Sequence, residues 1–324
     1  MTIPAIRIQN LNKHYTSPKK GKRPAENFHA LKNLNLEVQQ GEFFGYLGPN
    51  GAGKTTTISV LTGLSNFTSG KIEILGHDLV KEYQMARKNI GLAQQDLIFD
   101  PFLNLKEVLI YQAGYFGMEG KDVKARAEEL LKAFDLNQHA HKTFRMISGG
   151  QKRRLQLAKA MIHDPPILIL DEPTEATDTE LRHALWKYFK KLNTEGKTIF
   201  LTTHYIEEAE RLCDRIGIIN NGELIALEDK DKLIEKMAQQ FVQFKFREPV
   251  QELPVELNSY IVEMNDKGTE LKLQCKNAQH ELPILLQALE KAGIEVKKMN
   301  IIEDRLEDIY LKLTGGKIEE LGWI

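Results

Sequence analysis

The segment from Gly48 to Thr56 constrains what this chain can fold into more than any other stretch. It reads Gly-Pro-Asn-Gly-Ala-Gly-Lys-Thr-Thr and fits the pattern Gly-x-x-x-x-Gly-Lys-Thr of a phosphate-binding loop. The apolar run 43–47 precedes it, and Ile58, Leu61 and Leu64 follow it at helical spacing. This order predicts a buried strand, a glycine-rich turn and a helix.

A helix that begins at such a turn offers phosphate several free backbone N–H groups and the positive end of its dipole. The pattern assigns Lys54 to the β and γ phosphates of a nucleotide, and the hydroxyl of Thr55 to Mg²⁺. A glycine-rich turn without a ligand is the competing interpretation, and it is disfavoured because the motif and its flanks both fit. The predicted nucleotide-binding residues are Gly48, Pro49, Asn50, Gly51, Ala52, Gly53, Lys54, Thr55 and Thr56.

Two neighbouring carboxylates end another predicted strand. The apolar run 166–170 leads directly into Asp171 and Glu172. An aspartate in this place holds Mg²⁺ in phosphate-loop enzymes, directly or through water. Glu172 follows where a general base polarises a water opposite the γ phosphate. Acids also end strands for solubility alone, but the phosphate loop upstream favours the catalytic interpretation.

Two further features involve polar residues at the ends of predicted elements. Ser148, Gly149 and Gly150 open a basic helix and form a second helix N-terminus that is suited to an anion. His204 ends the apolar strand 198–203. From spacing alone, a hydrogen-bonded strand terminus explains His204 as well as a catalytic role does.

Composition indicates a globular protein of about two domains, because the 324 residues are 42% hydrophobic and 27% charged. Lys and Arg number 44 against 45 Asp and Glu, so the net charge of −1 gives no electrostatic case for nucleic acid as a partner. Cys213 and Cys275 suggest neither a disulfide framework nor a metal site, which favours a reducing compartment. No signal peptide and no run of about 18 apolar residues is evident.

Hydrophobic patterning predicts two domains, residues 1–235 and 240–324. In the first, short strands are expected at 6–10, 34–38, 70–74 and 90–92, a solvated basic loop at 18–24, and a helical insert at about 100–160. The dipeptide Asn221-Gly222 predicts a hairpin. The second domain has the pattern of a small α+β unit, with a hairpin at 261–273, helices from about 281 and 306, and a strand near 294–296.

These motifs together resemble the ATP-binding subunits of ABC transporters over about residues 4–235. Ile147-Ser148-Gly149-Gly150-Gln151 is similar to the signature motif of that family, with isoleucine where leucine is usual. The resemblance implies an α/β fold, a P-loop NTPase cassette with a helical insert, followed here by a small α+β domain. It also implies an ATPase that uses ATP and Mg²⁺.

The resemblance implies a role for each site residue. Tyr15 stacks on adenine, and Gln95 serves Mg²⁺ and communication with a membrane partner. Asp171 holds the metal, Glu172 is the catalytic base, and His204 contacts the γ phosphate, which decides between the two interpretations of that histidine. Asp178 matches the aspartate of a loop that crosses to a second subunit, although Glu175-Ala176-Thr177 departs from the usual residues before it.

The resemblance also implies partners. Two copies are expected to hold two ATP molecules head to tail, so that Lys54 of one chain and residues Ser148, Gly149, Gly150 and Gln151 of the other face the same nucleotide. A separate integral membrane permease is expected to place the chain at the cytoplasmic face of the membrane. The alternative is a soluble ABC ATPase of translation or DNA repair, which a single cassette without a long coiled coil disfavours.

The ending of the chain carries a weaker resemblance. Residues 305–315 are similar to the ending of bacterial ATP-binding subunits that serve drug, lipid or polysaccharide exporters. The helical spacing of Leu306, Ile309, Tyr310 and Leu313 is equally typical of a helix that closes a small core. No cluster with catalytic spacing occurs in residues 240–324, so a regulatory or dimer-supporting role is expected there.

Overall fold

The computed structural model describes residues 3–16, 27–175 and 177–315. The basic loop expected at 18–24 lies outside the described residues, as does Ala176. The chain divides into two compact units, residues 1–230 and 231–324. Each unit is described by itself below.

The main sheet of the first unit has six strands in the order β10-β9-β3-β8-β7-β6. All neighbours run parallel except β9 and β10, which form the hairpin that turns at Asn221-Gly222. Strands buried on both faces of a sheet have continuous apolar sequences, and every residue of β3 and β7 is buried. The strands are β3 (Phe43–Leu47), β6 (Ile90–Ala93), β7 (Ile167–Asp171), β8 (Thr198–Thr203), β9 (Arg215–Asn220) and β10 (Glu223–Asp229).

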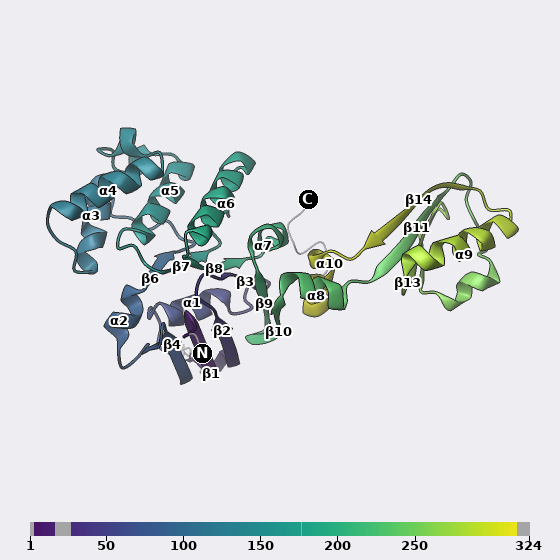
Figure 1. Cartoon of the computed structure of the whole chain (residues 1–324), viewed down its shortest axis with the longest axis horizontal. Helices are drawn as coiled ribbons and strands as arrows, with labels where there is room; N and C mark the ends of the chain where they lie inside the picture. The colour runs from purple at the N-terminus through teal and green to yellow at the C-terminus, as the bar shows by residue number, and fades with distance from the viewer. Residues whose placement is uncertain (1–2, 17–26, 176, 316–324) are drawn as a thin grey trace, which may run out of the picture. The chain divides into compact units, whose positions relative to one another are not determined.

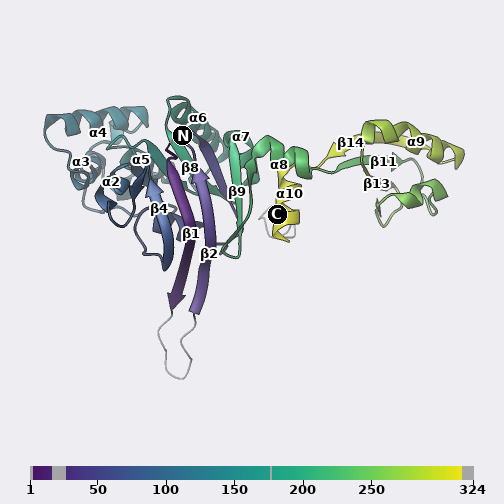
Figure 2. The same ribbon diagram turned by 60° about the horizontal axis from the view of Figure 1, so that its bottom comes forward.

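A second, antiparallel sheet has the order β2-β1-β4-β5. Its strands are β1 (Ile6–Thr16), β2 (Asn27–Val38), β4 (Ser69–Ile74) and β5 (His77–Asp78), and β1 and β2 lie side by side in Figure 2. Both β1 and β2 are longer than the alternation at 6–10 and 34–38 predicts. The reason is a series of register shifts after Ile8, which breaks the period of two that a sequence pattern requires.

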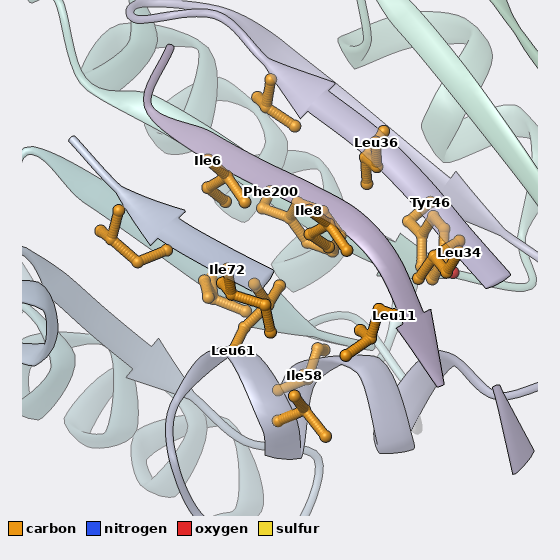
Figure 3. Packing of buried hydrophobic residues seen from close by; sticks show 14 of the residues in the cluster. Ile6, Ile8, Leu11, Leu34, Leu36, Tyr46, Ile58, Leu61, Ile72 and Phe200 are labelled. Carbon is orange, nitrogen blue, oxygen red and sulfur yellow. The ribbon is translucent and has the colours of Figure 1, made fainter. Parts of the chain in front are cut away.

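The largest core of the first unit lies between the two sheets and helix α1 (Lys54–Leu61). Ile6, Ile8 and Leu36 from the antiparallel sheet meet Tyr46 and Phe200 from the parallel one, as Figure 3 shows. The rings of Tyr46 and Phe200 are 5.4 Å apart between centroids. This packing fixes β3 and α1, and therefore the loop that joins them.

The remaining helices of the first unit follow the strands in sequence. They are α2 (Tyr83–Lys88), α3 (Leu105–Tyr115), α4 (Lys121–Ala133), α5 (Gly149–Ala160), α6 (Thr179–Thr194) and α7 (Ile206–Leu212), with single 3₁₀ turns at Asn137–His139 and Phe144–Met146. Helices α3, α4 and α5 all lie between β6 and β7 in sequence and gather together in Figure 1. No helix among the described residues is both long and apolar enough to cross a membrane.

The second unit contains an antiparallel sheet in the order β12-β13-β11-β14. Side chains of β11 alternate between buried and half-buried from Val242 to Phe246, and Val242, Phe244 and Phe246 pack with Leu285 and Leu289 of α9. The unit has its own core, which a compact unit of its size requires. Its elements are α8 (Lys230–Met237), β11 (Gln240–Phe246), a 3₁₀ turn (Val255–Ser259), β12 (Val262–Met264), β13 (Glu270–Cys275), α9 (Ala278–Lys291), β14 (Val296–Glu303) and α10 (Leu306–Thr314).

Candidate functional site

The site is built where three neighbouring parallel strands end. In the register of the sheet, Leu47 of β3 lies opposite Thr203 of β8, and Asp171 of β7 lies opposite Thr202. The carboxyl ends of parallel strands share one edge of the sheet, where ligands bind in open α/β folds. The loop after β3, Glu172 and His204 therefore meet at that edge.

The loop after β3 requires glycine at both ends. A Cβ at Gly48 would lie 2.5 Å from the backbone oxygen of Ile219, so only glycine fits there. Gly53 has φ +116° and a Cβ there would lie 3.1 Å from the backbone oxygen of Ala30. Helix α1 begins directly afterwards at Lys54, and its first turn carries no acidic residue. The loop is thus shaped for an anion at the helix N-terminus, with the side chain of Thr55 exposed.

The Lys54 ammonium lies inside this loop. Its Nζ donates to the backbone oxygens of Gly48 at 2.6 Å and Pro49 at 3.2 Å, and lies 3.4 Å from Oε1 of Glu172. The side chain is buried, and this burial lowers the pKa of Lys54 although the carboxylates around it favour the charged form. Lys54 thus presents a poorly hydrated positive charge at the loop.

The two acids at the end of β7 have different surroundings. Asp171 accepts a hydrogen bond of 2.6 Å from the Thr202 hydroxyl, and burial raises the pKa of Asp171. Glu172 contacts Nδ1 of His204 through Oε2 at 2.9 Å. Burial favours a raised pKa for Glu172 too, but the hydrogen bond with His204 and the charges of His204 and Lys54 outweigh it and lower the pKa. Glu172 is therefore ionised at neutral pH.

The backbone at Glu172 is strained. Its φ of +46° lies in the left-handed region that residues other than glycine seldom occupy. Residues in such conformations cost of order 1–3 kcal/mol each, and they persist where neighbouring contacts hold them. The backbone N–H of Glu172 donates to the backbone oxygen of Thr202 at 3.1 Å, and its own oxygen accepts from Arg153.

Arg153 is a buried residue beside the site that the sequence patterns do not single out. It is buried, and it donates to the backbone oxygens of Gln94 and Gln95 at 3.1 Å each and to that of Glu172 at 2.7 Å. It therefore ties helix α5 to the glutamine-bearing loop and to the strand-end acids. Leu157 and Ala160 follow Arg153 by four and seven residues, which places the three on one face of the helix. This spacing is the feature of the sequence that indicates an inward-facing Arg153.

We expect Arg153→Leu to lower the free energy of unfolding of the first unit by about 3 kcal/mol, because one buried and two partly buried carbonyl oxygens lose a charged donor. Arg154→Leu is the matched control. Arg154 pairs at 3.3 Å with the exposed Asp135, and such a surface pair contributes about 0–1 kcal/mol. Urea unfolding at pH 7 measures both variants, and equal losses for the two would contradict the bridging role of Arg153.

The side chain of Gln95 contacts a third acid, Glu175. Its exposed side chain donates to Oε2 of Glu175 at 2.7 Å, whereas its backbone is held by Arg153. The amide is thus at the edge of the site and is not locked inside it. Gln94, the neighbouring glutamine, is half-buried.

Helix α5 begins at Gly149 and is capped by Ser148, as the sequence predicts. The Ser148 hydroxyl accepts from the Gln151 backbone N–H at 3.3 Å, and the Gln151 side chain accepts from the Ser148 N–H at 3.0 Å. Asp178 caps α6 by accepting from the backbone N–H of Leu181 at 2.8 Å. Ser148 and Gly149 remain exposed, and among the described residues no hydrogen bond or ion pair joins them to the loop 48–55. One chain by itself therefore leaves this helix N-terminus facing outward.

Tyr15 lies near the end of β1, opposite Phe28 of β2. Its ring is 41% exposed, and Nζ of Lys13 lies 4.4 Å from the ring centroid. Further along β2, Ala30 and Leu31 are the residues that a Cβ at Gly53 would meet. The strand pair that carries Tyr15 thus runs past the phosphate-binding loop.

Comparison with known proteins decides the family. Residues 31–175 match the family described as ABC transporter. The chain is 35% identical over 296 residues to the linearmycin resistance ATP-binding protein LnrL of Bacillus subtilis, covering 90% of this chain and 95% of that protein. The chain belongs to the ABC transporter ATP-binding proteins. The predicted family is thereby confirmed, and this ABC ATPase binds and hydrolyses ATP.

Two further comparisons concern length and fold. A Nod factor export ATP-binding protein I of Burkholderia orbicola is 34% identical over 324 residues, covering 99% of this ABC ATPase and all of that protein. A dimeric structure of the ATP-binding cassette MJ0796, in a post-hydrolysis state with ADP and Pi, superimposes with a TM-score of 0.62 at 31% identity and covers 69% of this chain and 98% of that one. The predicted α/β P-loop cassette fold is confirmed.

Proposed function

We propose that this ABC ATPase energises an exporter by closing on ATP and opening after its hydrolysis. The observation that carries the proposal is similarity over the whole chain, second unit included, to proteins named for Nod factor export. The relative from Bacillus subtilis is named for resistance to linearmycin. Similarity through the second unit favours this class over soluble ABC ATPases of translation or DNA repair.

We assign the triphosphate to the loop 48–56, with the Lys54 ammonium on the β and γ phosphates and Tyr15 on the adenine ring. Lys54 supports this because it is buried, positively charged and held only by neutral carbonyls and Glu172. A phosphate that enters the loop would replace those carbonyls as acceptors. Charge-assisted contacts of this kind are about twice as strong as neutral ones.

The residues at the strand ends fit Mg²⁺. They are the exposed hydroxyl of Thr55, the Asp171 carboxylate and the Gln95 amide, all oxygen ligands of the type that this ion prefers. No group of three His, Cys, Asp or Glu that would hold a metal by itself occurs among the described residues. Mg²⁺ in nucleotide sites is usually bound by one or two carboxylates together with the phosphates, and Asp171 would be the carboxylate here. When bound, the ion neutralises charge that develops on the phosphates.

Glu172 is the general base in this proposal, and His204 is its companion at the γ phosphate. Glu172 is ionised and buried, and its oxygens are oriented by His204 and Lys54. From this position it accepts a proton from the attacking water. His204 keeps its other ring nitrogen, Nε2, for the phosphate oxygens.

A second copy completes each site. Ser148, Gly149, Gly150 and Gln151 form a helix N-terminus in which Ser148 and Gly149 are exposed, and among the described residues no hydrogen bond or ion pair joins these two to the phosphate loop of the same chain. Two copies related by a twofold axis place this helix end of one chain over the nucleotide of the other, with Asp178 at the crossing loop. MJ0796 is itself described as a dimer bound to ADP and Pi.

The transport partner is a separate membrane permease, which would hold the ABC ATPase at the cytoplasmic face of the membrane. We expect a tagged chain to copurify from detergent-solubilised membranes with a protein of several hydrophobic spans, and its ATPase rate to change when that protein is present. Copurification with ribosomes or DNA, and with no membrane protein, would contradict the transport role.

A further inference from the structure

The second unit has an edge strand that is suited to pair with its own copy. Strand β14 lies beside β11 at the margin of the sheet, as Figure 1 shows, and no other described strand pairs with it. The opposite margin is β12, which is only three residues long, whereas β14 has eight. An unpaired strand presents a row of backbone donors and acceptors that can pair with another chain.

The middle of the edge strand β14 carries exposed apolar side chains, at positions where edge strands usually carry charged ones. Met299 is 47% exposed and Ile301 is 44% exposed. Their partners in β11 are Phe244 and Val242, which are fully buried under α9. Met299 and Ile301 therefore lie on the covered face of the sheet and stay exposed only because no strand lies beyond them. Proteins usually protect such edges with charges or bulges, and β14 has these only at its ends, with Lys297, Lys298 and a register shift at one and Glu303 at the other.

Every second residue of β14 has backbone N–H and C=O groups that point away from β11 and can bond to a partner strand. The N–H of Asp304 donates to the backbone oxygen of Gln239 at 2.9 Å, in line with the register of β14 against β11. In an antiparallel pair, alternate residues bond to opposite neighbours. Even-numbered residues of β14 therefore bond to β11, and Met299, Ile301 and Glu303 direct their backbone groups to the free edge.

We propose that two copies of this chain pair antiparallel through β14, about a twofold axis at Asn300. In this register Met299 lies opposite Ile301 of the partner subunit, so apolar side chains meet apolar ones twice. Lys297 lies opposite Glu303 of the partner subunit, so the charges are also complementary. If the axis lay at Ile301, Met299 would lie opposite Glu303 of the partner subunit. If it lay at Met299, Ile301 would lie opposite Lys297 of the partner subunit.

This interface goes beyond the proposed ATP-dependent closure, because it needs no nucleotide. It keeps two chains together in the intervals when their cassettes are apart. Both interfaces are isologous, and each joins two copies about a twofold axis. The register shift near Lys297 leaves residues 298–303 regular against β11, so the ladder about Asn300 is regular over residues 298–302 of each chain, and the pair of Lys297 with Glu303 of the partner subunit lies at its end.

Cysteine cross-linking tests the register. In the proposed pairing Asn300 faces its own copy at a non-hydrogen-bonded position, where Cα atoms are about 4.5 Å apart and within disulfide reach. We expect full-length Asn300→Cys to form an intermolecular disulfide at least ten times faster than Lys298→Cys, which lies on the same face of β14. Lys298→Cys mixed with Ile302→Cys should cross-link to each other, because these two positions oppose in this register.

The same experiment separates this interface from the ATP-dependent one. Asn300→Cys should cross-link equally in a Lys54→Ala background and with nucleotide removed. A second variant, Met299→Lys with Ile301→Lys, changes only exposed side chains and should raise the dissociation constant of the nucleotide-free dimer at least tenfold in sedimentation velocity. Equal rates for Asn300→Cys and Lys298→Cys, or a nucleotide-free chain that is monomeric, would overturn the proposal and leave the shared ATP site standing.

Discussion

Glu172→Gln is expected to bind ATP with nearly unchanged affinity and to hydrolyse it about 10²–10⁴ times more slowly, which is the typical contribution of a general base. Glutamine keeps the size of the side chain and one acceptor oxygen, but its amide is neutral and cannot accept the proton of the attacking water. The lowered pKa of Glu172 shows that the native group carries the charge needed for this step at neutral pH. Phosphate release in single-turnover conditions measures the loss.

Glu207→Gln is the matched control for this prediction. Glu207 lies in α7 close to His204 in sequence, and it is an exposed residue that pairs with Arg211 at 3.0 Å. The same change of carboxylate to amide there should leave the hydrolysis rate within about twofold, as a surface pair contributes little. If Glu172→Gln hydrolysed ATP near the native rate, another group would have to be the base.

Lys54→Ala is expected to weaken ATP binding by about two to four orders of magnitude. Two charge-assisted hydrogen bonds to phosphate are lost, each contributing about 1.5–3 kcal/mol, and each 1.4 kcal/mol is a tenfold change in affinity. The Lys54 contacts within the loop are to neutral carbonyls and Glu172, so its removal also frees that carboxylate. Isothermal titration calorimetry with Mg-ATP measures the change directly.

Lys71→Ala serves as the control for Lys54→Ala. Lys71 pairs with Glu73 on the exposed antiparallel sheet, and half of its side chain is exposed. Its removal should leave the ATP dissociation constant unchanged, while thermal melting checks that both variants remain folded. Unaltered ATP binding by folded Lys54→Ala would exclude the loop 48–56 as the nucleotide site.

The part of this site that the sequence predicts is the part set by local chemistry. Gly48 and Gly53 are required by close backbone contacts, and Asp171 ends a strand with an unbroken apolar sequence. The glycine motif and the apolar strand can each be recognised within one short segment of the sequence. Parallel strands then bring those stretches to one edge without further information. The same reasoning explains why β3, β7 and β8 were predicted more accurately than β1 and β2, whose register shifts erase the alternation.

The features that sequence patterns did not reveal depend on contacts between distant segments. Arg153 bonds to residues 58 and 59 positions before it and 19 after it, and nothing near it in sequence identifies those acceptors. The strained φ of Glu172 is likewise visible only in three dimensions. The exposure of Met299 and Ile301 depends on the order of strands in the sheet, which no spacing within β14 encodes.

The central claim is that two chains share each nucleotide. The measurement that tests it most directly is a structure of the Glu172→Gln variant trapped with Mg-ATP. It should show the terminal phosphate contacted by Lys54 of one chain and by Ser148 of the partner subunit, twice per dimer. A trapped complex in which one chain alone surrounds that phosphate, with Ser148 facing solvent, would contradict the claim.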